Sequence, residues 1–290
     1  MGQNVDMSGI AESPMAGDWI DFRRDSETGI ESVNAHFKGH AYDDHDHEEL
    51  LLGVTLQGSQ RFSCHRAVHT STPGKAILIE PGAVHDGYAA QPTGFTYAML
   101  YIPQKYVADS LNRYGMGDIS VVQAAFRHTL TEDRALIVAI SQAFDAIHNN
   151  EGRLARDEGL DRLLAHLMPH VERKPAIELT ESLLKMNRVR DYLHEHLAWN
   201  PGLDELTHIS GIDRFRLSRQ FKAAFGQSPH AYLVRLRLRT ARQLLASGLS
   251  PVLVASQTGF ADQSHLGRWF KRAYRITPAT FQSSCTNVLY

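Results

Sequence analysis

The chain has 290 residues, a formal net charge of −2 and two cysteines, and these numbers exclude several classes of protein. Its length fits two ordinary domains, and with 43 % hydrophobic and 21 % charged residues it has the composition of a folded globular protein. No stretch reaches the roughly 18 apolar residues of a membrane-spanning helix, the N-terminus lacks a signal-peptide pattern, and two distant cysteines make no disulfide framework. We therefore predict a cytoplasmic protein that does not bind membranes.

From about residue 32 to residue 103 the sequence predicts an antiparallel β-barrel or sandwich. Short runs rich in β-branched and aromatic residues alternate there with glycine and proline turns. The expected strands cover residues 50–57, 61–64, 76–79 and 95–102.

Beyond residue 103 the spacing of apolar residues becomes helical. Leu136, Ile140 and Phe144 fall on one face of a predicted helix, and Leu160, Leu163 and Leu167 repeat this pattern in the next one. These two stripes of the helical part, which spans about residues 103–172, either cover the sheet or pair with a second subunit. We expect residues 134–168 to provide the interface of a homodimer. A polar segment at 172–175 is then predicted to be a linker between domains 1–175 and 176–290.

The small net charge hides an asymmetry along the chain. Residues 178–290 carry 15 Lys and Arg against 8 Asp and Glu, whereas residues 1–177 carry 15 against 24. A basic C-terminal third beside an acidic remainder suggests that only one end of the chain meets a polyanion.

An internal repeat within this basic third carries the functional prediction. Residues 217–222, Leu-Ser-Arg-Gln-Phe-Lys, recur 49 positions later as Leu-Gly-Arg-Trp-Phe-Lys at 266–271, and Pro229 recurs as Pro278 at the same offset. Such a repeat indicates one supersecondary unit that is used twice.

Each copy has the pattern of a helix-turn-helix unit. A short helix ends at Gly211 or Gly259, where glycine adopts a left-handed backbone without a Cβ penalty. Asp213 and Asp262 follow as N-caps that accept hydrogen bonds from free backbone amides of the second helix. The two units are predicted at 203–225 and 251–274.

The second helix of each unit presents a polar face that suits DNA. Arginine pairs with guanine and glutamine with adenine in the major groove, whereas lysine near a helix end suits phosphates. Two αα-hairpins with solvated charged faces are the alternative, and for Phe215 we expect packing rather than stacking on DNA sugars. The candidate DNA-binding residues are Arg214, Phe215, Ser218, Arg219, Lys222, Gln263, Ser264, His265, Arg268 and Lys271.

Between the two units, residues 229–246 are predicted to form a single helix. This helix carries Arg235, Arg237, Arg239 and Arg242 and would fix the separation of the two recognition helices. Two such helices about 34 Å apart can enter successive major grooves on one side of a duplex.

The region from about 184 to 281 resembles the AraC/XylS family of transcription regulators. The resemblance lies in Gly-Phe-x-Asp-Gln-Ser at 259–264, in the two Leu-x-Arg-x-Phe-Lys repeats and in Pro229 and Pro278. It implies two helix-turn-helix units joined by a long helix. It also implies base-contacting positions at Phe215, Ser218, Arg219, Gln263, Ser264 and Arg268.

In the N-terminal part, three histidines resemble the two-part signature of cupin barrels. His45-Asp-His47 is the first part and Pro-Gly-Ala-Val-His, ending at His85, is the second, although the glutamate and the asparagine of that signature are missing. The histidines either lie on a solvated acidic loop, line a pocket for an organic effector, or ligate a divalent transition metal such as Zn²⁺, Fe²⁺ or Mn²⁺.

The family resemblance favours the effector pocket, because sensor domains of arabinose-regulator type are cupin barrels. No cofactor is therefore expected, and a metal on His45, His47 and His85 is kept as the alternative. The candidate effector-binding residues are His45, His47, Glu49, Arg61, His85 and Tyr101.

Together these patterns predict an α+β protein with a cupin-like barrel, a helical dimerisation hairpin and an all-α bipartite helix-turn-helix domain. The predicted function is a sequence-specific transcription regulator, expected to be an activator and not an enzyme, that responds to a small-molecule effector. Its expected partners are double-stranded DNA, the effector and a second copy of the chain, with RNA polymerase as a candidate. The alternative is a metal-dependent cupin enzyme, a dioxygenase or isomerase, fused to a DNA-binding module.

Overall fold

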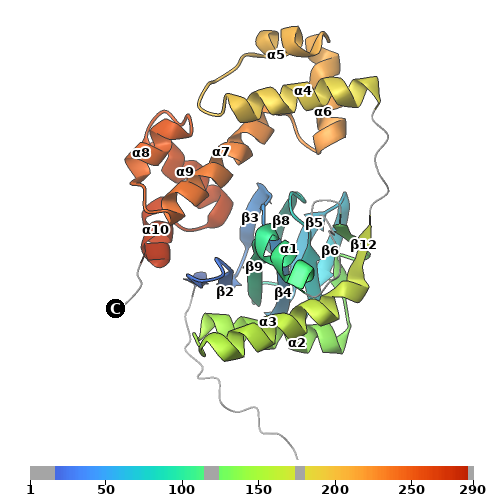
Figure 1. The fold of residues 1–290 in the computed structure, drawn as a ribbon, viewed down its shortest axis with the longest axis vertical. Coiled ribbons are helices and arrows are strands. Elements are labelled where there is room, and N and C mark those ends of the chain that lie inside the picture. The colour runs from blue at the N-terminus through green and yellow to red at the C-terminus, as the bar shows by residue number, and fades with distance from the viewer. Residues whose placement is uncertain (1–16, 114–123, 174–179, 287–290) are drawn as a thin grey trace, which may run out of the picture.

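The computed structural model describes residues 17–113, 124–173 and 180–286, which form a β-rich part and a helical part (Figure 1). Antiparallel sheets make up the β-rich part, with two long helices below them, and the helical part lies above the opposite end of the sheets. This arrangement confirms the predicted α+β class. No helix within the described ranges is long and apolar enough to cross a membrane.

All strand pairs in the β-rich part are antiparallel. A six-stranded sheet has the order β1-β2-β9-β4-β7-β11, a four-stranded sheet has the order β3-β8-β5-β6, and β10 pairs with β12. The strands are β1 Trp19–Arg24, β2 Glu31–Phe37, β3 His40–His45, β4 Leu50–Gly58, β5 Gln60–Cys64, β6 Ala67–Ser71, β7 Ala76–Ile79, β8 His85–Ala89, β9 Phe95–Ile102, β10 Ala124–Phe126, β11 Leu130–Thr131 and β12 Val171–Arg173. Each of the four expected strands is present within one residue of its predicted ends.

Strand β9 shows how the core is divided. All eight of its residues are buried, because β9 lies in the middle of the six-stranded sheet and both of its faces are covered. Side chains alternate between the two faces of a strand. Tyr97 and Met99 therefore belong to the cluster between the sheets, whereas Leu100 and Ile102 belong to the cluster under the helices.

The helices α2 (Arg134–His148) and α3 (Arg153–Leu167) cover the outer face of this sheet. Ile140 and Leu163, central residues of the two predicted stripes, are fully buried against strand residues such as Leu52. The expectation that these stripes form a dimer interface is therefore wrong, since they belong to the core of a single chain.

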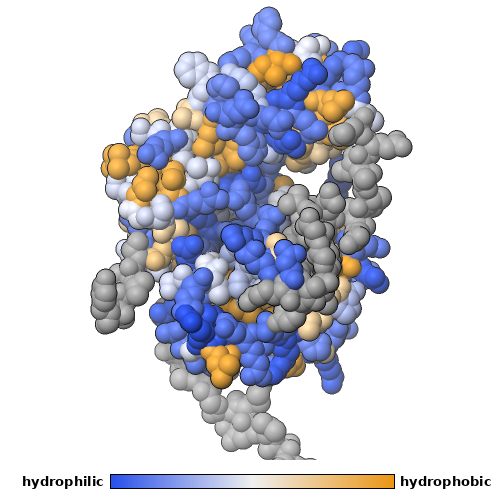
Figure 2. Space-filling model, viewed as in Figure 1, coloured by the Kyte–Doolittle hydropathy of each residue, from blue (hydrophilic) through white to orange (hydrophobic). Residues whose placement is uncertain are grey.

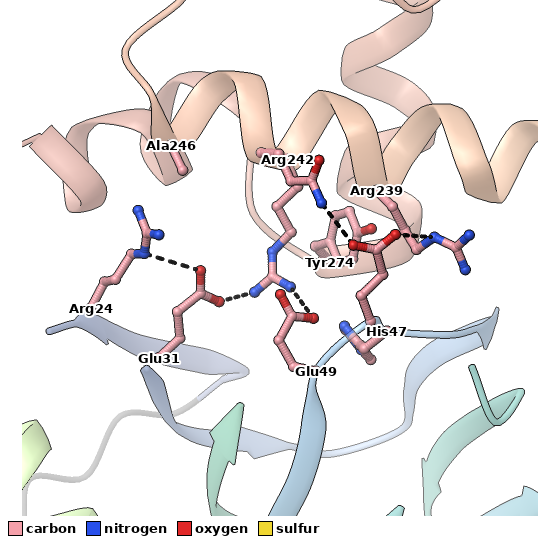
Figure 3. A pocket seen from close by; sticks show the side chains of 10 residues that line it. Arg24, Glu31, His47, Glu49, Arg239, Arg242, Ala246 and Tyr274 are labelled. Atoms are coloured by element: carbon pink, nitrogen blue, oxygen red, sulfur yellow. Dashed lines mark hydrogen bonds and ion pairs between the residues drawn. The ribbon is translucent and has the colours of Figure 1, made fainter. Parts of the chain in front are cut away.

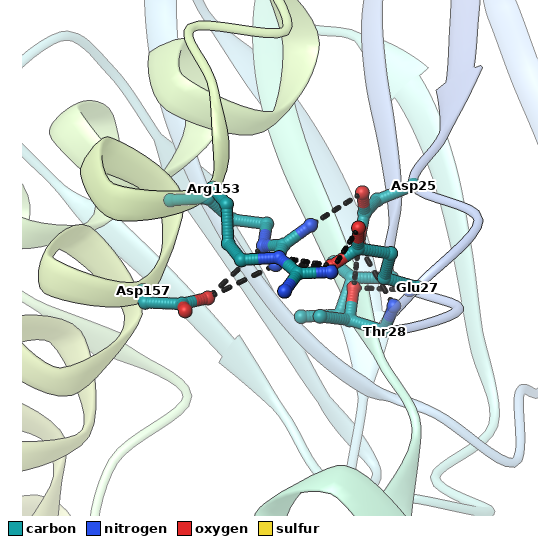
Figure 4. Close-up of polar contacts among 7 residues, drawn as sticks. Asp25, Glu27, Thr28, Arg153 and Asp157 are labelled. Carbon is teal, nitrogen blue, oxygen red and sulfur yellow. Dashed lines mark hydrogen bonds and ion pairs between the residues drawn. The ribbon is translucent and has the colours of Figure 1, made fainter.

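A polar network fixes the start of α3 to the turn between β1 and β2 (Figure 4). Arg156 donates to Asp25 at 3.0 Å and to Glu27 at 2.8 Å, and Arg153 donates to Glu27 at 2.7 Å. Asp25 in turn accepts from the backbone amide of Thr28 at 2.8 Å, which shapes the turn. Because Arg156 is buried and shared by several carboxylates, it orients α3 on the sheet.

The segment predicted to be a linker begins as a strand. Residues Glu172 and Arg173 belong to β12, which pairs with β10, so the prediction of a linker from residue 172 is wrong for these two residues. The rest of that segment, Lys174 and Pro175, lies outside the described residues. Two short helices, α1 (Gln104–Arg113) and η2 (Met168–His170), complete the β-rich part.

Seven helices of the described residues form the helical part, and they build two small cores. One core joins α4, α5, α6 and the start of α7, and the other joins the end of α7 with α8, α9 and α10. Helix α7 therefore connects two helix-turn-helix units, as its arginine-rich sequence predicts. The helices are α4 Glu181–Glu195, α5 Leu203–Ser210, α6 Arg214–Phe225, α7 Pro229–Ala246, α8 Pro251–Gln257, α9 Gln263–Tyr274 and α10 Pro278–Thr286.

Candidate nucleic-acid interface and sensor site

The two helix-turn-helix turns are built from local hydrogen bonds. Gly211 and Gly259 have φ values of 65° and 76°, in the left-handed region where a side chain would be strained. Asp213 accepts a hydrogen bond from the amide of Arg216 at 3.0 Å, and Asp262 accepts one from the amide of His265 at 2.6 Å. These contacts start α6 and α9 at the predicted residues.

The apolar faces of α6 and α9 are buried and their polar faces are open. Leu217, Phe221, Leu266 and Phe270 are all 0 % exposed, as the repeat predicts. On the opposite faces, the predicted DNA-binding side chains that are exposed are Arg214, Phe215, Arg219, Lys222, Gln263, Ser264, Arg268 and Lys271, and Ser218 and His265 are half-buried.

Phe215 departs from expectation. Its side chain is 91 % exposed at the start of α6, so the expectation that it packs in the interior is wrong. A large aromatic ring in water is costly unless another surface covers it. Its neighbour Arg214 donates to Asp204 at 2.6 Å, which holds that guanidinium beside the exposed ring. Phe215 thus becomes a contact candidate rather than a core residue.

The ring of His265 has partners within its own unit. Trp269 donates its indole N–H to Nε2 at 3.0 Å, and the amide of Ala261 lies 3.3 Å from Nδ1. Both groups are N–H donors that point at ring nitrogens, so the two contacts hold the ring against its own unit. His265 therefore stabilises the turn, whereas Gln263 and Arg268 on the same helix stay free to reach outward.

Two basic residues of α6 face the barrel across a cleft. Arg219 and Lys222 line a cleft of about 690 Å³, whose other wall includes His65, Glu80 and Gly82. A DNA duplex needs far more room, because its major groove alone is about 12 Å wide and 8.5 Å deep. In this arrangement the barrel stands in front of part of the polar face of α6.

The face of the helical part that Figure 2 shows is largely hydrophilic. Hydrophobic residues gather over α8, where Val252 and Leu253 are 61 % and 55 % exposed. Helix α8 buries Val254 and Ala255 and leaves these two residues in solvent.

Inside the barrel, His45, His47 and His85 come together as the cupin-like signature predicts. Their side chains are buried, and one ligand nitrogen of each lies within 4.8 Å of the others. His45 ends β3 directly opposite His85 on β8, after irregularities in the β3 register, and His47 lies just beyond the strand. The interpretation that these residues lie on an exposed acidic loop is therefore wrong.

The three imidazoles are held in defined orientations. Nδ1 of His45 donates to the backbone carbonyl of Asp43 at 2.7 Å, and Nδ1 of His85 donates to the carbonyl of Ala83 at 2.9 Å. Burial lowers the pKa of all three histidines below the usual range, so they are neutral near pH 7.

Two other predicted effector residues lie near this cluster and one does not. The ring of Tyr101 lies 4.9 Å from that of His47, and Glu49 shares a small cavity with His47. Arg61, by contrast, is exposed on β5 and lies over the ring of Tyr88 at 5.8 Å. Its prediction as an effector-binding residue is contradicted, because its side chain points away from the barrel interior.

The space around the histidines is small. The cavity between the sheets, lined by His45, His85, Tyr97 and Tyr101, has a volume of about 40 Å³, and the one beside His47 and Tyr274 has about 30 Å³. Organic ligands occupy pockets of about 300–1,000 Å³. The closed barrel therefore has room for an ion or a water molecule but not for an organic effector.

The helical part closes this site from above through Arg242 of α7 (Figure 3). The Arg242 guanidinium is buried and pairs with Glu31 and, at 3.4 Å, with Glu49. Tyr101, Tyr274 and Phe281 surround it, with ring centres 5.2–5.5 Å from its central carbon. Arg242 thus ties α7 and the neighbouring helices directly to the barrel.

Titration within this contact falls near neutral pH. Burial raises the pKa of Glu31 to about 7, although the positive charge of Arg242 opposes the shift. Burial also disfavours the charge of Arg242, but the carboxylates of Glu31 and Glu49 prevail and raise its pKa.

Further arginines extend the contact along the barrel rim. Arg239 pairs with Asp46 at 3.4 Å and with Glu48 at 3.3 Å. Arg272 pairs with Asp43, and Arg275 donates to the backbone carbonyl of His40 at 2.7 Å.

Sequence reasoning missed this role of the α7 and α9 arginines, and it did not single out the acidic partners Glu31 and Asp46. Arg237 is different again: it donates to the backbone carbonyls of Leu197 and Trp199 at 2.9 and 2.7 Å. The only available signal was the acidic run around the histidine pair, which faces these arginines.

Comparison with known proteins agrees with this architecture. The family model of the AraC-like ligand binding domain matches residues 27–164, and that of a helix-turn-helix domain matches residues 206–284. The chain thus combines a ligand-binding β domain with a helix-turn-helix domain, and this combination identifies it as a transcription regulator. It belongs to the AraC family.

Named relatives point the same way. The chain is 26 % identical to the HTH-type transcriptional regulator YbfI of Bacillus subtilis over 236 residues, which cover 79 % of this chain and 84 % of that protein. It is 34 % identical to the HTH-type transcriptional activator RhaS of Escherichia coli over 106 residues, or 34 % of this chain and 36 % of RhaS. The crystal structure of ToxT from Vibrio cholerae O395 has the same fold, with a TM-score of 0.54 and 13 % identity over 94 % of this chain and all of that one.

Proposed function

We propose that this AraC-family regulator is a transcription activator whose DNA binding is controlled by its N-terminal barrel. The observation that carries the proposal is the buried contact of Arg242 with Glu31 and Glu49, which lies in the same small cavity as His47. The sensor site and the DNA-binding helices thus share a wall. RhaS is named an activator, which supports activation rather than repression.

The proposed DNA contacts come from the exposed faces of α6 and α9. We assign base contacts to Arg219 and Gln263 and backbone contacts to Lys222 and Lys271, because guanidinium and amide groups read base edges whereas ammonium groups mainly bind phosphates. Phe215 joins them because of its 91 % exposure. The proposed helix-turn-helix units are 203–225 and 251–274, within a DNA-binding domain that follows a sensor domain of residues 1–175.

In the closed arrangement, in which the barrel lies against the helical part, the barrel restrains the DNA-binding helices. Arg219 and Lys222 line the cleft that separates α6 from the barrel, so DNA reaches them only when the two parts move apart. An effector that binds the open form better than the closed form shifts the population toward DNA binding. We place the effector between the barrel and α7, beside His47 and Tyr101, where opening enlarges the present small cavities.

Solved relatives support a small acidic effector. ToxT has been solved with an unsaturated fatty acid and with a methylnaphthalenyl butenoic acid, both of which carry a carboxylate. In this chain Arg242 would offer such a carboxylate a buried guanidinium in place of Glu31. We further propose that the chain is not an enzyme, because its relatives are named transcription regulators, and that it acts in the cytoplasm.

Self-association and a contact with RNA polymerase stay predictions. The stripes of α2 and α3 are no longer available for a dimer interface, so other surfaces would have to form it. Sedimentation equilibrium of the full chain measures self-association directly.

The DNA-binding assignment is tested by selecting binding sites for the full chain from a random duplex library. We expect Arg219→Ala and Gln263→Ala each to lose preference at one local base position, at a cost of about 1–3 kcal/mol. Lys222→Ala and Lys271→Ala should weaken all sequences about equally and reduce the salt dependence of binding by about one phosphate contact each. Unchanged motifs for both Arg219→Ala and Gln263→Ala would show that these helix faces do not read DNA.

A further inference from the structure

We propose that His45, His47 and His85 bind one divalent transition-metal ion, with at least one coordination position left open toward Arg242 and Tyr274. The inference deepens the proposed sensor function, on which only its regulatory consequence rests. Its basis is the convergence of three buried imidazoles, whose ligand nitrogens lie within 4.8 Å of one another. Zinc requires ligand nitrogens about 2.0–2.1 Å from a common centre, so we expect the cluster to contract around the bound ion.

The hydrogen bonds around the cluster prepare it for a metal. Nδ1 of His45 and Nδ1 of His85 are both used as donors to backbone carbonyls, those of Asp43 and Ala83. The proton is thereby fixed on Nδ1, and the lone pair of Nε2 is free on each ring. Backbone carbonyls that orient the ligand histidines in this way are typical of metal sites.

His47 supplies the strongest single observation. Its two ring nitrogens are buried, and neither has a hydrogen-bond partner among the described residues. Leaving a buried polar atom without a partner costs about 1–3 kcal/mol. A metal ion between His47 and its two neighbours gives one of these nitrogens a partner, whereas the ring contacts with Tyr101 and Tyr274 give it none.

Size and ligand chemistry select the kind of occupant. Cavities of about 40 and 30 Å³ beside the histidines exclude organic molecules but hold an ion with one or two waters. Three neutral imidazoles without a thiolate favour Zn²⁺, Fe²⁺, Co²⁺ or Ni²⁺ over Ca²⁺ and Mg²⁺, which prefer oxygen ligands. With three protein ligands, a tetrahedral ion keeps a fourth position for water or for a donor atom of the effector.

The position of the site connects it to the DNA-binding helices. Asp46 stands between two of the ligands and pairs with Arg239 of α7 at 3.4 Å, and the ring of Tyr274 lies 5.9 Å from that of His47. A metal that fixes residues 45–47 therefore also fixes the acidic groups that hold α7. We expect the metal-bound chain to be the closed one.

The test is a Co²⁺ titration of the full chain, prepared without a histidine tag and stripped of metal. Wild-type protein should bind one Co²⁺ per chain, with the intense visible ligand-field bands of a four- or five-coordinate site. His47→Gln and His85→Gln should weaken Co²⁺ binding by more than about 100-fold, since even outer-shell changes cost about 10–100-fold. His69→Gln is the matched control, because His69 belongs to the same sheet but bonds to the carbonyl of Cys64 outside the cluster.

A second variant keeps the test valid if a glutamine variant fails to fold. His85→Cys replaces one metal ligand by another and should restore Co²⁺ binding with a new thiolate charge-transfer band in the near ultraviolet. The inference is overturned if folded wild-type protein binds no Co²⁺, or if His47→Gln and His85→Gln bind it as tightly as His69→Gln.

The same samples separate this inference from the proposed function. Sequence-specific DNA binding without Co²⁺ binding overturns the metal site alone, and Co²⁺ binding without DNA binding overturns the proposed function alone. If Co²⁺ binds but small-angle X-ray scattering shows no compaction of the chain, the regulatory consequence is wrong.

Discussion

Arg242 offers the most direct test of how the barrel controls the DNA-binding helices. In Arg242→Met the aliphatic part of the side chain is kept, but the guanidinium between Glu31 and Glu49 is lost. Removing one partner of a buried ion pair costs up to about 3–5 kcal/mol, and Glu31, whose pKa is already about 7, can reduce this cost by taking up a proton. Three aromatic rings within 5.5 Å of the guanidinium add about 0.5–2 kcal/mol each in lost cation–π attraction.

The chain can avoid this cost by opening. If α7 leaves the barrel, water hydrates Glu31 and the cost of burying it unpaired disappears. The loss of stability in Arg242→Met therefore cannot exceed the free energy of the contact between α7 and the barrel. The substitution changes contacts with Tyr101, Tyr274 and Phe281 at the edges of the two apolar cores, but the rest of each core stays in place. We therefore expect Arg242→Met to separate the two parts rather than to unfold either one.

The expected readouts are an increased radius of gyration in small-angle X-ray scattering and tighter DNA binding, because Arg219 and Lys222 are released from the cleft. Arg188→Met is the control, since Arg188 is exposed on α4 and its removal changes the charge equally. Adding Glu31→Leu to Arg242→Met removes the unpaired carboxylate and should close the chain again. If scattering and DNA affinity are the same for wild type, Arg242→Met and Arg188→Met, the ion pair does not hold the closed form.

Three further predictions concern other parts of the molecule. Phe215→Ala should change the free energy of unfolding by less than about 0.5 kcal/mol, as expected for a surface position, yet weaken DNA binding; unaltered affinity in a filter-binding assay would remove Phe215 from the interface. Ile140→Glu should unfold the β-rich part, because Ile140 is 0 % exposed, whereas Leu154→Glu, at an 82 % exposed position of α3, should leave its melting temperature nearly unchanged; a folded monomeric Ile140→Glu protein would revive the dimer interpretation. The folded-state pKa of Glu31 is raised from 4.5 to about 7, so between these pH values the folded protein binds one more proton at Glu31 than the unfolded chain does. The stability that Glu31 contributes is therefore present at low pH and is lost as pH rises through 7. Wild-type protein should therefore lose up to about 3 kcal/mol relative to Glu31→Gln between pH 5 and pH 8 in chemical denaturation, and parallel pH profiles of the two proteins would contradict this.

The sequence by itself determined the helix-turn-helix units, because their features are local. A glycine at the turn, an aspartate cap and apolar residues one helical turn apart all act within about 25 residues, and the repeat supplied a second copy of each. In the structure, Gly211 accordingly forms the left-handed turn, Asp213 caps α6 and Leu217 is buried. The histidine pair and His85 were also found from sequence, since two short motifs carry them to facing strands.

Only the tertiary structure decided which surface each remaining side chain meets. An apolar stripe on α2 requires burial, but the pattern is the same whether a sheet or a second subunit provides the cover. Arg61 lies on a strand whose face depends on register, and register is fixed by distant partners.

The arginines of α7 show the same limit most clearly. The sequence predicts a single arginine-bearing helix between the two units but not the partners of its arginines, and Arg242 binds Glu31, which lies 211 residues away in the chain. Local spacing holds no information about such a partner, because the pair exists only once the barrel and α7 are folded against each other.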